Sequence, residues 1–326
     1  MVLSSSVGSF PGDSARAYGE WVRASLDTLS LPAVPELPGR GAIASMTGRA
    51  LAMVVELGAD LQPAGWRLTD AAGVDQRRAR SLLAQDLDTL EELGQEYAGP
   101  LKVQVAGPWT LAATVERPRG DKLLADHGAR RELAQALAEG VAAHVADVRR
   151  RVAGVSRLVV QVDEPALPAV MGGRVPTASG FGKHRSVDKP EASEALEWVL
   201  GAIAGAGAEP WVHSCAPGAP LALLRGAGAR GLSVDLALVD AAGQDVLAET
   251  LEAGDAVALG VVPSTEPDDP PGDAAVTQRV ERWLDMVGLE PGPSLVVTPA
   301  CGLSGASPGW ARRALELSAA AARSLS

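Results

Sequence analysis

The sequence predicts an α/β protein with the (β/α)8 TIM-barrel architecture. Eight short apolar runs with strand character follow one another along the 326 residues, and most are separated by Ala-, Leu- and Arg-rich segments with helical apolar spacing. Chemically distinctive residues also follow directly after several of these runs. Because a barrel of parallel strands carries its functional site at the carboxyl ends of the strands, this placement indicates a single barrel domain over residues 1–326.

The predicted elements follow in chain order. The strand-like runs cover residues 2–7, 52–61, 101–106, 158–162, 210–215, 231–236 and 256–262, and a final run ends near 299. The second run is the most ambiguous, because residues 51–57 also fit the end of a helix. Helical spacing is strongest at 75–93 and 126–152, similar at 193–206 and 310–325, and shorter at 244–252. The proline-rich segment 31–41 and the acidic segment 263–272 are interpreted as long loops.

Composition narrows the class of protein. Hydrophobic residues make up 47% of the chain, which is ample for a core, and the formal net charge is −11. That charge argues against a general nucleic-acid or anionic-membrane binder, which depends on basic patches. No export signal and no membrane-spanning run is recognised. With two cysteines, these features predict a cytoplasmic protein whose thiols stay reduced.

The two cysteines and one histidine suggest a metal site. His213 and Cys215 end one strand-like run, and Cys301 follows the last run. Zinc favours such nitrogen and sulfur ligands in tetrahedral geometry, and Asp235, at the end of another run, is the candidate fourth ligand. The plainer alternatives are that both cysteines are buried small hydrophobes or form a disulfide. The common position at strand ends favours the metal.

Together, several motifs resemble the C-terminal catalytic domain of cobalamin-independent methionine synthase. They extend from the first predicted strand to the last, so the resemblance covers nearly the whole chain. The matching segments are Val-Gly-Ser-Phe-Pro at 7–11, Ala-Gly-Pro-Trp-Thr at 106–110, Gln-Val-Asp-Glu-Pro-Ala-Leu at 161–167, His-Ser-Cys at 213–215 and Pro-Ala-Cys-Gly-Leu at 299–303. The resemblance implies a (β/α)8 barrel that uses Zn²⁺ to activate the homocysteine sulfur for methylation.

The resemblance also implies roles for individual residues. His213, Cys215 and Cys301 match the family's zinc ligands, and Asp235 stands where the family has a glutamate. Ser9 matches a residue that helps to hold the substrate carboxylate, and Asp163 matches the acid that faces the substrate ammonium. Without the resemblance, a turn residue and a strand-end cap are the simpler interpretations of these last two positions.

The chain departs from the family pattern at several places. Trp66, in Gly-Trp at 65–66, is aligned with a family carboxylate that contacts the substrate ammonium, so one acid rather than two is expected there. Thr114 stands where the family stacks an aromatic residue on folate, and the Asp-x-His motif after the seventh strand is replaced by Gly-Val-Val-Pro-Ser at 260–264. The N-terminal half of full-length folate-dependent enzymes is also missing, which favours the short, single-domain branch.

These observations predict a zinc-dependent methyltransferase acting on a small-molecule thiol, most simply homocysteine to give methionine. The methyl donor is expected to be methyl-folate or a methyl-corrinoid. One alternative is a different thiol with a methyl-corrinoid donor, and another is a non-catalytic barrel that binds a thiol or a metal. No nucleic-acid or membrane partner is expected.

Overall fold

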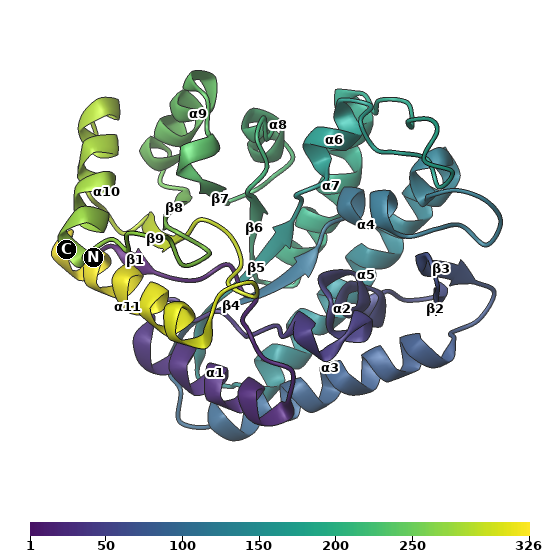
Figure 1. The fold of residues 1–326 in the computed structure, drawn as a ribbon, viewed down its shortest axis with the longest axis horizontal. Helices are drawn as coiled ribbons and strands as arrows, with labels where there is room; N and C mark the ends of the chain where they lie inside the picture. The colour runs from purple at the N-terminus through teal and green to yellow at the C-terminus, as the bar shows by residue number, and fades with distance from the viewer.

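The computed structural model describes residues 1–326, and its centre is a curled sheet of seven parallel strands (Figure 1). The strand order is β1-β9-β8-β7-β6-β5-β4, with every neighbouring pair parallel. The strands of this sheet are β1 Leu3–Ser4, β4 Gly99–Ala106, β5 Val155–Asp163, β6 Glu209–Ser214, β7 Gly231–Asp235, β8 Ala256–Val262 and β9 Leu295–Pro299. Seven of the eight predicted strands are thereby confirmed.

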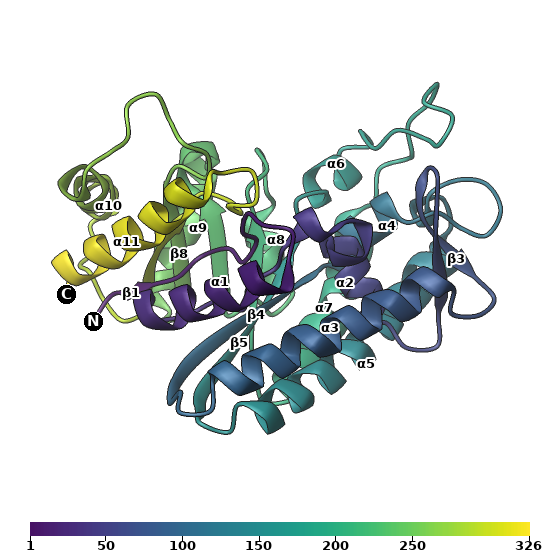
Figure 2. The ribbon, with the colours of Figure 1, turned by 60° about the horizontal axis from the view of Figure 1, so that its bottom comes forward.

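The helices lie around the outside of the sheet, and Figure 2 shows α3 and α5 running side by side along one flank of the molecule. Their bounds are α1 Ala15–Thr28, α2 Met46–Met53, α3 Val74–Leu93, α4 Pro108–Thr114, α5 His127–Arg151, α6 Leu167–Met171, α7 Lys189–Gly205, α8 Leu221–Gly226, α9 Ala241–Glu252, α10 Asp273–Val287 and α11 Pro308–Ser324. Asp126 and Asp188 accept backbone N–H groups at the starts of α5 and α7, as N-cap residues do. All five predicted helices are confirmed. No helix is both long and apolar enough to cross a bilayer.

The predicted second strand, 52–61, is wrong. Its first residues belong to helix α2, which begins after the N-cap Ser45. The following residues form β2, Gly58–Gln62, which pairs antiparallel with β3, Gly65–Thr69, in a separate two-stranded hairpin. Residues 51–57 fit helical and strand patterns alike, and in the folded protein the residues up to Met53 close helix α2.

The segment 31–36 lies between the two edges of the sheet, β1 and β4. The Leu31 N–H donates to the Ser4 carbonyl, and the Lys102 N–H donates to the Pro32 carbonyl. Further along, the Val34 N–H donates to Lys102 and the Glu36 N–H to Gly8. Prolines at 32 and 35 lack an N–H, so the segment cannot form a regular ladder. The proline-rich stretch predicted as a loop therefore bridges both edge strands while remaining irregular.

Two apolar clusters fill the fold. The larger one packs the outward side chains of the strands against the helices. The smaller one consists of Leu31, Val159, Trp211, Ala256, Ala258 and Val296, all fully or nearly fully buried. Ala256 and Ala258 alternate along β8, so they point to the same face of the sheet, and Leu31 belongs to the bridging segment. The concave face of the sheet therefore has its own packed layer beneath the strand ends.

Candidate metal and thiol site

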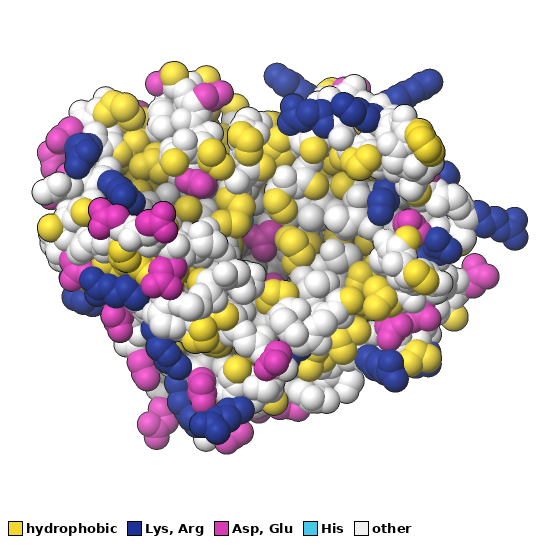
Figure 3. All heavy atoms as spheres, viewed as in Figure 1, with side chains coloured by type: hydrophobic (Ala, Val, Ile, Leu, Met, Phe, Trp, Pro, Cys, Tyr) yellow, Lys and Arg dark blue, Asp and Glu magenta, His cyan; other side chains and the backbone are white.

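A cavity of about 340 Å³ opens where strands of the sheet end. Figure 3 shows a hollow at the centre of this face, with acidic side-chain atoms visible inside it. The cavity is lined by Val7, Ser9, Glu36, Pro38, Ser45, Met46, Gln104, Asp163, Pro165, His213, Cys215, Cys301, Gly302 and Ser304. Five of the seven predicted site residues therefore meet at one place, although they come from distant parts of the chain.

His213, Cys215 and Cys301 form the donor cluster of this cavity. Their potential ligand atoms all lie within 4.8 Å of one another. In the structure the sulfurs of Cys215 and Cys301 are joined as a disulfide, with the two Cα atoms 5.9 Å apart. A metal site and a disulfide are the alternatives that the sequence leaves open, and the structure brings the cysteines close enough for either.

The surroundings of His213 fit a metal ligand. Its Nδ1 lies 3.1 Å from the Ser233 carbonyl and 3.0 Å from the Ser233 hydroxyl, so this nitrogen is held by the neighbouring strand. Its Nε2 is buried and has no hydrogen-bond partner. Burial lowers the pKa of His213 to about 3, with Lys102 contributing, which keeps the imidazole neutral as metal binding requires. A ligating histidine usually forms a hydrogen bond through its other ring nitrogen, as His213 does with Ser233.

This donor set fits zinc when the cysteines are reduced. Two thiolates and a neutral imidazole are among the preferred zinc ligands, and three protein ligands leave one position for a further ligand. The disulfide and the zinc site are alternative states of the same two sulfurs, since a sulfur in a disulfide is no longer a thiolate. Zinc binding would therefore require the reduced protein.

The structure does not bring Asp235 into this cluster. Asp235 ends β7, and its Oδ1 accepts the Ala237 N–H at 3.0 Å, which caps the short turn Leu236–Leu238. Burial raises the pKa of its carboxyl. The residue borders two neighbouring hollows instead of the cavity that contains the cysteines. Its role as a zinc ligand stays a prediction.

Ser9 and Asp163 lie at the cavity as predicted. Ser9 follows β1, and its carbonyl accepts the Leu303 N–H at 2.8 Å. A side chain at Gly302 would collide with the Ser9 hydroxyl, so the glycine leaves room for that group at the cavity wall. Asp163 ends β5 beside His213 in the sheet register, and Gln161 Nε2 donates to its Oδ1 at 2.7 Å. Burial, and then the negative charge of Glu36, raises the pKa of Asp163 to about 8.

Trp66 is not brought to the cavity. It lies in the β3 hairpin, its side chain is buried in the main apolar cluster, and its Nε1 approaches the Ala42 carbonyl at 3.4 Å. It does not line the cavity that holds the other residues. The alignment of Trp66 with a substrate-binding carboxylate therefore has no support in the arrangement of the chain.

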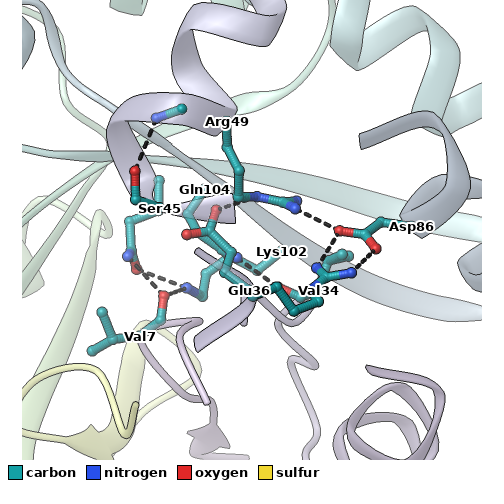
Figure 4. Close-up of polar contacts among 11 residues, drawn as sticks. Val7, Val34, Glu36, Ser45, Arg49, Asp86, Lys102 and Gln104 are labelled. Atoms are coloured by element: carbon teal, nitrogen blue, oxygen red, sulfur yellow. Dashed lines mark hydrogen bonds and ion pairs between the residues drawn. The ribbon is translucent and has the colours of Figure 1, made fainter. Parts of the chain in front are cut away.

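The acid that the sequence analysis missed is Glu36, in the proline-rich segment. Its carboxylate lines the cavity, and its backbone pairs with Ser9 through a parallel bridge. Arg49 Nε donates to Glu36 Oε1 at 3.1 Å, and Arg49 Nη1 donates to Asp86 Oδ2 at 2.7 Å, as Figure 4 shows. Arg40 adds a bidentate pair to Asp86. One signal was available: Glu36 is the only charged residue within an apolar run, 31–38.

Lys102 lies behind the acidic side of the cavity. Its Nζ donates to the Val7 carbonyl at 2.9 Å and to Gln161 Oε1 at 2.7 Å, and Gln161 in turn holds Asp163. Burial lowers the pKa of Lys102 to about 8, although the charges of Asp163 and Glu36 oppose that shift. The acids at the cavity wall are thus supported by buried hydrogen-bond donors of the protein.

The fold and cavity define an α/β protein with a thiol and imidazole donor cluster at the carboxyl ends of a curled parallel sheet. Residues 101–324 match the family model described as "Cobalamin-independent synthase, Catalytic domain". The chain belongs to this family, as the resemblance predicted. No curated protein matches the chain.

The comparison with solved structures shows a likeness of fold to a methionine synthase, and a weaker match to a second protein. A B12-independent methionine synthase from Shewanella sp. W3-18-1, in complex with selenomethionine, is 15% identical, with 98% of this chain and 96% of that chain covered and a TM-score of 0.65. SrfJ from Salmonella typhimurium is 11% identical, with 98% and 74% covered and a TM-score of 0.47. At 15% identity, the likeness to the Shewanella protein concerns the fold alone.

Proposed function

We propose that this protein is a zinc-dependent methyltransferase that methylates the sulfur of an amino-acid thiol, most simply homocysteine. The observation that carries the proposal is the composition of one cavity, where the His213, Cys215 and Cys301 donors face the carboxylates of Glu36 and Asp163. Membership of the cobalamin-independent synthase family supports methyl transfer as the reaction class. The Shewanella protein of the same fold is in complex with selenomethionine, an amino acid of the corresponding shape.

The two acids favour a substrate with an ammonium group, and the positive charge of that group would lower the raised pKa of Asp163, because an opposite charge nearby stabilises the ionised form. A carboxylate offers about four lone-pair positions, so the contacts of Glu36 with Arg49 and of Asp163 with Gln161 leave acceptors free. A charge-assisted hydrogen bond contributes about 1.5–3 kcal/mol. The expectation that Asp163 alone would meet the ammonium is replaced in this proposal by a pair of acids, Glu36 and Asp163. The Ser9 hydroxyl, on the same wall, is proposed to hold the substrate carboxylate.

The chain's own residues would orient the thiol toward the donor cluster. Zinc, when bound, would keep the substrate sulfur deprotonated near neutral pH, because a metal cation lowers the pKa of a thiol that binds it. His213, Cys215 and Cys301 would hold the ion, and Asp235 stays the proposed fourth ligand. Glu36, Asp163 and Ser9 would fix the other end of the substrate, so that its sulfur meets the methyl donor in a near-attack arrangement. Methyl-folate and a methyl-corrinoid are the proposed donors.

The test is methyl transfer by reduced, zinc-loaded protein. Homocysteine and a simple alkyl thiol would each be offered methyl-folate and a methyl-corrinoid, and formation of methionine or of the alkyl methyl thioether would be measured. We expect turnover with homocysteine that is lost in the Cys215→Ser variant. Absence of methyl transfer with both donors, from protein that contains stoichiometric zinc, would contradict the proposal.

A non-catalytic protein that binds a thiol or a metal is the second candidate. The observation that favours it is that His213 is the only histidine at the cavity, because His127 and His184 pair with carboxylates elsewhere and His144 is buried in α5. Such a protein would bind zinc and homocysteine without turnover. The same assay, combined with calorimetry of homocysteine binding, separates the two candidates.

A further inference from the structure

A second hollow, of about 650 Å³, lies beside the metal and thiol site. We call it the α10 groove, because it lies between the ends of β7, β8 and β9 and helix α10. Asp235, Gly260 and Ala300 form its inner side, and Arg279 and Arg282 of α10 form its outer side. Ala300 directly precedes Cys301, so the groove and the cysteine cavity share a wall. Apart from Asp235, none of the groove residues takes part in the chemistry proposed above.

The two arginines of the α10 groove form no ion pair. They are one helical turn apart on the same face of α10, and both side chains are exposed. Arg279 Nη1 donates to the Val261 carbonyl at 2.9 Å, which holds this side chain along the groove wall. Arg282 has one long contact, 3.4 Å, with Gln278. The chain has 40 acidic residues against 29 basic ones, but no carboxylate pairs with either guanidinium group, so both can contact an anion from solution.

The loop after β8 adds further hydrogen-bond donors to the groove. Ser264 and Thr265 both line it, and their hydroxyl groups form no hydrogen bond within the protein. Their backbone N–H groups are also free of protein acceptors. Guanidinium groups, hydroxyls and free N–H groups are the donors that bind a carboxylate or a phosphate. Asp235 is the one acid in the groove wall, and its Oδ1 is already taken by Ala237.

We propose that the α10 groove binds the anionic tail of the methyl donor, with Arg279 and Arg282 as the main contacts. This inference rests on the proposed methyl transfer. A methyl donor must place its methyl group in the cysteine cavity, so the rest of the donor must extend out of the cavity at the carboxyl ends of the strands. The groove is far larger than one oxyanion, and it begins at the wall that carries Cys301. The shared chemistry is an oxyanion on a flexible tail, which both a glutamate-bearing methyl-folate and a phosphate-bearing methyl-corrinoid possess.

Basic residues elsewhere at the mouth fit this role less well. Arg117 pairs with Asp126, and Lys122 Nζ donates to the Thr114 carbonyl. These residues line neither the cysteine cavity nor the α10 groove. The α10 groove combines unpaired cations with direct adjacency to the site.

The test compares donors with and without an anionic tail. Calorimetry would measure the affinity of the reduced, zinc-loaded protein for two pairs of donors. The first pair is methylcobalamin and methylcobinamide, which lacks the nucleotide phosphate. The second pair is methyl-tetrahydrofolate with three glutamates and methyl-tetrahydrofolate with one glutamate. The variant is the double substitution Arg279→Gln and Arg282→Gln. Its matched control is Arg23→Gln with Arg323→Gln, which removes the same charge from two exposed arginines that form no ion pair. Inorganic phosphate serves as a probe that does not depend on the donor.

We expect the unsubstituted protein to prefer one tail-bearing donor over its tail-poor counterpart by about tenfold or more, the effect of one charge-assisted contact. In the Arg279 and Arg282 variant this preference should fall to within about twofold, phosphate binding should weaken about tenfold, and homocysteine affinity should not change. The control should behave like the unsubstituted protein. A preference within the cobalamin pair would identify a corrinoid donor, and a preference within the folate pair would identify a folate donor.

Two results would overturn the inference. One is a preference for the tail-bearing donor that is equal in the unsubstituted protein and the groove variant. The other is no preference between the donors together with no phosphate binding. Failure of the proposed function looks different. In that case no donor would yield methionine, while phosphate binding would still depend on the two arginines, and the anion site would stand. Equal melting temperatures of variant and control would show that the groove variant is folded.

Discussion

The two sides of the cavity differ in how the chain builds them. The donor side consists of His213, near the end of β6, and of Cys215 and Cys301, which come after β6 and β9. The acidic side combines Asp163, at a strand end, with Glu36, which lies in the irregular segment between β1 and β4. The donor side is held by the hydrogen bonds of the sheet. The acidic side also depends on buried ion pairs, because proline prevents a regular ladder at 32 and 35.

This comparison indicates that the two sides fail in different ways. Substitution on the donor side should remove the metal while leaving the fold intact. Substitution behind the acidic side should reduce the stability of the protein, because the charges there are paired in the interior. The following predictions test that difference, from the largest expected effect to the smallest.

Cys301→Ser should lower zinc affinity by several orders of magnitude, because serine is a harder ligand that is not deprotonated near neutral pH. Zinc content after dialysis against a chelator, measured on reduced protein, would fall from about one per chain to near zero. Ser304→Ala, at the same cavity, is the control and should keep its zinc. Stoichiometric zinc in a Cys215→Ser, Cys301→Ser double variant would place the metal elsewhere.

Arg49→Ala should lower the free energy of unfolding by about 3–5 kcal/mol, the cost of breaking a buried ion pair. Arg49 is buried between Glu36 and Asp86, and Asp86 keeps Arg40 as a partner in the variant. Urea unfolding would give the change. Arg16→Ala, which removes an exposed pair with Glu20, should cost less than about 1 kcal/mol. Equal losses in both variants would mean that the acidic side does not depend on this network.

Glu36→Gln should weaken homocysteine binding about tenfold to a hundredfold, because one charge-assisted contact with the ammonium group is lost. Zinc content should not change, since Glu36 lies on the other side of the cavity. A thiol without an ammonium group, 3-mercaptopropionate, is the internal control and should bind equally to both proteins in calorimetry. An equal loss for both thiols would indicate general damage to the cavity, and no loss for either would remove Glu36 from the substrate site.

Trp66→Phe should change homocysteine affinity by less than about twofold. Trp66 packs in the core away from the cavity, and phenylalanine retains most of its apolar contacts while losing one long hydrogen bond. The same calorimetric titration measures this effect. A large loss of affinity would mean that Trp66 reaches the substrate after all, and would restore its original alignment with the family carboxylate.

Much of the fold was predictable because regular elements depend on local patterns. The strand containing His213 and the helices at α3 and α5 follow from apolar spacing, which is a property of neighbouring residues. The second strand failed because residues 51–57 satisfy helical and strand patterns alike. Only packing against the rest of the protein could decide between them, and it selected helix α2.

The site divides in the same way. The sequence by itself determined the donor side, since cysteine is rare in this chain and both cysteines follow strands whose ends must meet at one edge of a parallel sheet. It also placed Ser9 and Asp163, through motifs at strand ends. Only the tertiary structure decided that Glu36 faces the cavity, that Trp66 does not, and that Asp235 lies beside the cysteine cluster. These positions depend on contacts between residues far apart in the chain, such as Glu36 with Arg49 and Arg49 with Asp86, and no local pattern records such contacts.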